Sequence, residues 1–211
     1  MVAEINLEIA TNYLEQKKYD KAITANHQGL WAAETIQDSE RLFKLFQQNG
    51  KIHLEKGAEK KSISAYGQAL WNLRYDRRQV PMDNNYLLFA LKEEGNSFLK
   101  EYINLLLSES EKNLSKILEV LSVLKLSEFQ IYFNDPCLDI FVETIKQEQE
   151  SKRIAEKEAI IYTFITPEKT YLLSQIGKNT PLVEEINVSQ KELTEAIEQY
   201  RLDLVNIFDR H

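Results

Sequence analysis

The stretch AEINLEIATNYLEQKKYDKAI (residues 3–23) decides the fold, together with its continuation to Trp31. Within it the small residue Ala10 is followed three positions later by the aromatic Tyr13. Two further small residues, Ala22 and Gly29, come after a turn. The same order recurs 40 residues on, where the corresponding positions hold Gly50, His53, Ser62 and Ala69. Self-similarity at a fixed spacing predicts an array of helical hairpins.

The pattern resembles the tetratricopeptide repeat. In that family a small residue in the first helix lets a neighbouring helix approach closely, and the aromatic fills the remaining gap. Asn6 and Phe46 stand at the family's tryptophan position in the two copies. A spacing of 40 exceeds the usual period of about 34 residues, so we expect longer helices. Gly57 would occupy the turn of the second hairpin, where positive φ suits glycine. A third copy would start near Leu91, with Gly95 and Phe98 at the small and aromatic positions.

Composition limits the possible functions. Hydrophobic residues make up 43% of the 211 positions and charged residues 28%, enough for a core and a soluble surface. The net charge of −7 disfavours nucleic acid, and the cluster Arg74, Arg77 and Arg78 is expected to cap a helix end. A single cysteine suits the reducing cytoplasm. Neither a signal peptide nor a membrane span is expected, because no stretch reaches about 18 continuous apolar residues.

The sequence predicts a mainly α protein in three parts. TPR-like helical repeats (an α-solenoid) occupy residues 1–110, a helical connector 111–157, and an α+β segment 158–211. The connector begins with a helix over 113–125, has another starting at Pro136, and ends in a charged helix end or linker over 146–158. Three strands (159–165, 170–174 and 181–188) are expected to form an antiparallel meander.

A final helix is expected after the capping box Ser189–Glu192, with Val188 and Leu193 as a hydrophobic staple. Its apolar stripe should cover one face of the small sheet. The stripe consists of Leu193, Ala196, Ile197, Tyr200, Leu204 and Phe208.

The second half resembles proteins with a CHAT domain, the caspase-like domain associated with tetratricopeptide repeats. KLSEFQIYFNDPCL (125–138) is similar to the segment after their repeats, and EAIIYTFITPEKTYLL (158–173) to the first hairpin of the domain. NVSQKEL (187–193) and the following helix resemble the next step, so the likeness covers residues 114–208. Proteases of this family use a histidine and a cysteine at strand ends beyond this region. Cys137 corresponds to a different family cysteine, so the resemblance implies truncation before the catalytic dyad.

No catalytic, cofactor or metal site is expected. A cysteine–histidine pair would need Cys137 beside His27, His53 or His211, and nothing in the spacing brings them together. We expect Cys137 to be structural, His53 to pack in the aromatic position and His27 to lie on the surface. Three histidines and one cysteine lack metal-ligand spacing, and the glycines form no phosphate loop. Carboxylate pairs such as Glu93–Glu94 and Glu184–Glu185 are expected to be solvated.

The expected function is a non-enzymatic adaptor that binds a protein or peptide and needs no small-molecule cofactor. Its polar groove residues would come from the first helices of the hairpins, although ordinary surface positions explain each of them equally well. One alternative is the amino-terminal part of a CHAT-type protease, and another is a remnant without a present role. The groove candidates are Asn6, Asn12, Lys17, Asn49 and Lys56.

Overall fold

The protein is described by a computed structural model that covers residues 1–79, 96–109, 112–133, 159–177 and 181–208. The chain divides into two compact units, unit 1 (Met1–Asp139) and unit 2 (Ile140–His211). The expectations for Gly95, Cys137, Glu93–Glu94, residues 146–158 and His211 fall outside the described residues. This division is coarser than the three predicted parts, because the helix of the predicted connector lies in unit 1.

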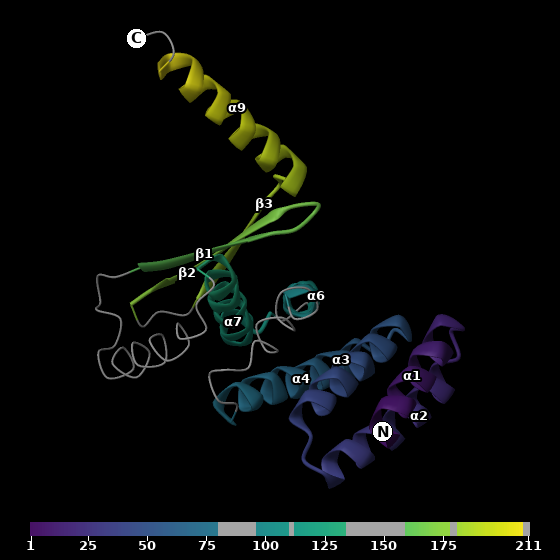
Figure 1. Cartoon of the computed structure of the whole chain (residues 1–211). Helices are drawn as coiled ribbons and strands as arrows, with labels where there is room; N and C mark the ends of the chain where they lie inside the picture. The colour runs from purple at the N-terminus through teal and green to yellow at the C-terminus, as the bar shows by residue number, and fades with distance from the viewer. Residues whose placement is uncertain (80–95, 110–111, 134–158, 178–180, 209–211) are drawn as a thin grey trace. The chain divides into compact units, whose positions relative to one another are not determined.

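Unit 1 consists of helices that pack in consecutive pairs (Figure 1). Helix α1 (Val2–Glu15) pairs with α2 (Tyr19–Thr35), and α3 (Ser39–Glu55) pairs with α4 (Glu59–Gln79). The pair α6 (Asn96–Ser108) and α7 (Leu114–Phe133) follows. Helix α3 contacts both α1 and α2, so the first two hairpins are stacked. This arrangement confirms the predicted series of antiparallel helical hairpins.

Three of the connections use the same backbone turn. The residue after each helix has positive φ: 56° at Lys17, 52° at Gln37 and 77° at Gly57. In the last case the Ala58 N–H donates to the His53 carbonyl at 2.8 Å, and the Gly57 N–H donates to the Leu54 carbonyl at 2.9 Å. These two bonds satisfy helix-end carbonyls in a Schellman motif. The expected role of Gly57 is therefore confirmed.

The small residues of the repeat permit close helix contact. A Cβ at Gly50 would lie 2.1 Å from the ring of Tyr66, and one at Gly29 would lie 2.8 Å from Leu45. Tyr66 in turn meets the third hairpin, with its ring centroid 5.4 Å from that of Phe98 and 5.7 Å from that of Tyr102. Burial raises the pKa of the Tyr102 hydroxyl to about 12. Phe98 is fully buried, as its predicted aromatic position requires.

Unit 2 contains the predicted antiparallel meander in the order β1–β2–β3. Its strands are β1 (Ala159–Ile165), β2 (Thr170–Ile176) and β3 (Leu182–Ile186). Phe164 pairs with Tyr171, and Leu173 pairs with Val183, so these residues share one face. Strand β3 is shorter than predicted, because the Val188 N–H bonds back to the Ile186 carbonyl at 2.8 Å and turns the chain.

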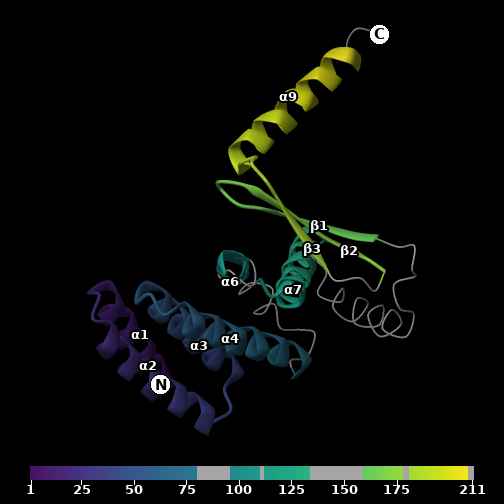
Figure 2. The same ribbon diagram turned by 180° about the vertical axis from the view of Figure 1, so that it is seen from behind.

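Helix α9 (Gln190–Phe208) begins at the predicted capping box. The Ser189 hydroxyl accepts from the Glu192 N–H at 3.2 Å, and the Glu192 carboxylate accepts from the Ser189 N–H at 2.8 Å. The prediction that this helix covers the sheet is wrong. Figures 1 and 2 show α9 leading away from the strands, and Ile197, Tyr200 and Leu204 are exposed. The amphipathic pattern identified the apolar stripe but carried no information on the direction of the helix.

Candidate functional site

A buried amide network joins the first three helices. Asn26 on α2 is fully buried, and its Nδ2 donates to the Leu45 carbonyl and to Gln48 Oε1, each at 2.9 Å. Asn49 Nδ2 donates to Asn26 Oδ1 at 2.8 Å. Gln48 Nε2 then donates to Thr11 Oγ1 at 2.8 Å, which reaches α1. Because a buried amide without a partner is costly, this network fixes the register of one hairpin on the next.

Asn49 is therefore not a groove residue, and the prediction for it is wrong. It lies on α3, as expected, but the packing of α2 covers its side chain. The helical period of α3 alone did not distinguish a solvent-facing amide from one that meets a neighbouring helix. Asn26, whose role the sequence did not reveal, is its partner.

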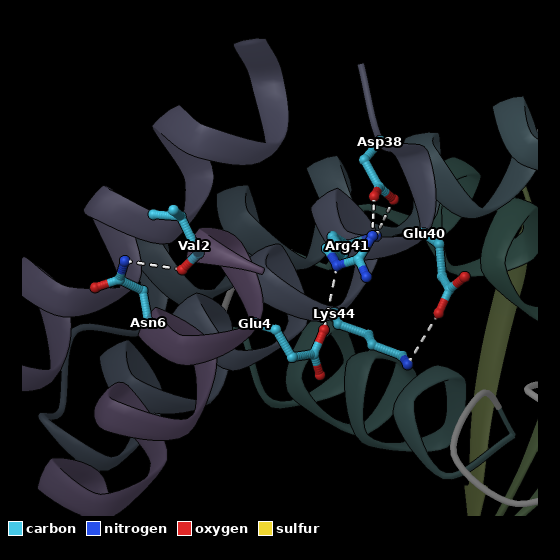
Figure 3. A network of polar contacts seen from close by, with 7 residues as sticks. All are labelled: Val2, Glu4, Asn6, Asp38, Glu40, Arg41 and Lys44. Atoms are coloured by element: carbon cyan, nitrogen blue, oxygen red, sulfur yellow. Dashed lines mark hydrogen bonds and ion pairs between the residues drawn. The ribbon is translucent and has the colours of Figure 1, made fainter. Parts of the chain in front are cut away.

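A second polar network lies at the start of the first two hairpins (Figure 3). Arg41 Nε on α3 contacts Glu4 Oε2 on α1 at 3.2 Å, and the same guanidinium pairs with Asp38. Asp38 and, more weakly, Glu4 raise the pKa of the Arg41 guanidinium. The Arg41 N–H also donates to Asp38 Oδ1 at 3.0 Å, so Asp38 caps α3. These partly exposed pairs orient α1 on α3 and add little stability each.

The other predicted groove residues do not converge on one place. Asn6 donates to the Val2 carbonyl of its own helix at 3.0 Å, as Figure 3 shows, and Asn12 donates to the Glu8 carbonyl at 3.2 Å. Lys56 pairs with Asp20 Oδ1 at 2.6 Å, which links the turns of the two hairpins. Lys17 lies exposed at the first turn. The structure thus does not assemble the predicted set into one site.

The histidines occupy the positions that the sequence predicted. His27 is exposed on α2, and His53 is buried on α3. Nδ1 of His53 has no hydrogen-bond partner among the residues that the structure describes. Burial lowers the pKa of His53, and the nearby positive charges of Lys61 and His27 lower it further. Its imidazole is therefore held neutral and packed, which is the expected structural role.

The described parts of the chain contain no group of three or more His, Cys, Asp or Glu residues that could hold a metal ion. No described helix is both long and apolar enough to cross a membrane. An open hollow of about 390 Å³ lies between the β1–β2 turn and the first turns of α9. Its lining includes Pro167, Gln190 and Thr194. Lys191 and Glu195 at its rim lie 3.8 Å apart, so the hollow offers few unsatisfied polar groups.

Two tryptophans form the most distinctive surface feature of unit 1. Trp31 on α2 is 72% exposed, and Trp71 on α4 is 55% exposed. They are 40 residues apart, so they occupy the same position in successive hairpins. The segments around them, 22–32 and 62–72, also match at Ile23 and Ile63, Ala25 and Ala65, Gln28 and Gln68, and Leu30 and Leu70. A comparison of the two second helices would have revealed this pair, whereas the first helices do not.

Comparison with known proteins adds no assignment. No family model matches the chain, and no curated protein matches it in sequence. The tetratricopeptide and CHAT resemblances therefore stay predictions.

Proposed function

We propose that unit 1 is a non-enzymatic helical-repeat module that binds a protein or peptide partner. The observation that carries this proposal is the pair Trp31 and Trp71, exposed at equivalent positions of two stacked hairpins. Tryptophan is enriched among the residues that dominate binding energy at protein interfaces. A repeated, exposed tryptophan has no packing role that would explain its presence at both positions.

The hairpins hold these side chains on a rigid support. The amide network of Asn26 fixes α2 on α3, and the ring of Tyr66 fixes α4 on α3 and α6. A partner therefore meets two indole rings on helices that are already ordered. Less conformational entropy is lost on binding to such a preorganised surface. The partner chemistry that fits is a chain with apolar side chains at two separated positions.

Selection of displayed random peptides on the full chain, followed by calorimetry, would test this proposal. We expect bound peptides to lose about 30-fold in affinity with Trp31→Ala and Trp71→Ala together, the loss of one strong contact. Ile36→Ala is the matched control, because Ile36 is exposed on α2 but its counterpart in the second hairpin is Asp76. Equal binding by the double variant, or the recovery of no peptide, would contradict the proposal.

The single cysteine supports placing this module in a reducing compartment such as the cytoplasm. A second candidate is the amino-terminal part of a CHAT-type protease. It is favoured by the small sheet of unit 2, one face of which carries exposed isoleucines. The genomic sequence downstream separates the candidates: an in-frame continuation with a strand-ending histidine and cysteine supports the second. Peptidase activity of the present chain by itself would contradict the non-enzymatic proposal.

A further inference from the structure

One face of the unit 2 sheet is apolar and open to solvent. Strand pairing places Ile161 and Ile165 of β1 on the same face as Ile176 of β2 and Leu182 of β3. These four residues, the outer sheet face, are between 39% and 66% exposed. The opposite face is covered, since Phe164, Tyr171 and Leu173 are buried there. A soluble protein rarely leaves such a contiguous apolar patch open without an interaction that uses it.

Helix α9 presents a second apolar surface. Ile197, Tyr200 and Leu204 follow one another at helical spacings of three and four residues, so they share one face. These residues, the α9 stripe, are 52%, 64% and 36% exposed. The stripe and the outer sheet face are thus two complementary apolar surfaces in one unit, and neither covers the other.

The start of α9 keeps its stripe away from its own sheet. The Gln190 N–H donates to the Thr166 carbonyl at 3.2 Å, and Thr170 Oγ1 donates to the Val188 carbonyl at 2.9 Å. The capping box of Ser189 and Glu192 fixes the first turn as well. Folding α9 back over β1–β3 would break these bonds. The helix of another molecule can reach the outer sheet face without breaking them.

We infer that two copies of this chain form a two-fold dimer in which the α9 stripe of each copy covers the outer sheet face of the other. The exposed fractions correspond to roughly 400 Å² for each surface, hence on the order of 800 Å² per copy, which is the area that each partner buries in a standard interface. The exchange is reciprocal, so one two-fold axis closes the assembly and leaves neither surface open. This inference concerns unit 2 and is independent of the tryptophans of unit 1.

The first test is the mass of the full chain by sedimentation equilibrium. We expect twice the 24.7 kDa of one chain, with a dissociation constant at or below about 10 µM. Ile161→Lys and Tyr200→Glu should each yield the monomer with unchanged helix content, because both side chains are already more than 60% exposed. Ile36→Lys, at an exposed apolar residue of unit 1, should leave the dimer intact. A wild-type chain that stays monomeric well above this concentration overturns the inference, as does a dimer that both unit 2 variants retain.

A second test addresses the geometry through disulfide cross-linking in a Cys137→Ser background. Chains with Ile161→Cys are mixed with chains of a different tag that carry Tyr200→Cys, and air oxidation follows. The arrangement predicts that disulfides between the two kinds of chain form faster than those between like chains. Faster linkage between two Tyr200→Cys chains would mean that α9 packs on α9, and would overturn the proposed geometry. An intrachain disulfide in the double variant would overturn it too, because it would mean that α9 covers its own sheet.

Discussion

Replacing Gly50 by alanine gives the most direct test of the packing between α3 and α4. The added Cβ would lie 2.1 Å and 2.2 Å from Cδ1 and Cε1 of Tyr66. The ring is fully buried, and Phe98 and Tyr102 lie on it with centroids 5.4 Å and 5.7 Å away. Relief of the clash therefore requires the third hairpin to move together with the ring.

The magnitude follows from two opposing contributions. An ordinary contact begins at 3.4 Å, so a Cβ at 2.1 Å requires a displacement of 1.3 Å. Overpacking of a tight core costs about 1–3 kcal/mol, and a clash with a caged ring belongs at the upper end. Alanine in a helix interior recovers about 1 kcal/mol relative to glycine. We expect Gly50→Ala to lower the free energy of unfolding by about 2 kcal/mol.

Gly67→Ala is the matched control, because Gly67 lies inside α4 and its Cβ would meet only the Tyr102 hydroxyl at 3.4 Å. This variant should gain up to about 1 kcal/mol from helix propensity alone. Urea denaturation followed by far-ultraviolet circular dichroism measures both effects. If both variants are stabilised, or if Gly50→Ala leaves the midpoint unchanged, the close approach of α3 and α4 is refuted.

Two further predictions concern single residues of the first two hairpins. Lys17→Gly should raise the free energy of unfolding by up to about 1 kcal/mol in the same denaturation assay, because Lys17 has φ of 56° where the second hairpin has Gly57. Lys18→Gly, at a residue with φ of −90°, should not stabilise the chain, and equal gains from both variants would rule out backbone strain at Lys17. His53→Phe should remove an acid sensitivity: the lowered pKa of His53 means that the unfolded state binds the extra proton as pH falls below about 6.5, so wild-type stability decreases there. Thermal melting at pH 7.5 and 5.5 should show a smaller difference in the variant, and an unchanged difference would exclude His53 as its source.

The local elements were predictable from the sequence because short-range rules govern them. The repeat of small residues identified Gly50, which the structure places against Tyr66. The box Ser189–Glu192 located the start of α9, and β-branched residues located β1. Each of these features depends on neighbours within a few positions. The segment containing Trp31 and Trp71 was equally accessible, since an offset of 40 residues aligns it, but the comparison has to include the second helices.

The sequence by itself determined the hairpins, their turns, the meander and the amphipathic face of the last helix. Only the tertiary structure decided which of these faces meet. Asn49 became a core residue because α2 covers it, and α9 left its sheet open because bonds from Gln190 and Thr170 direct it outward. The physical reason is that periodicity marks a face that must be covered, whereas contacts between residues far apart in the chain decide what covers it.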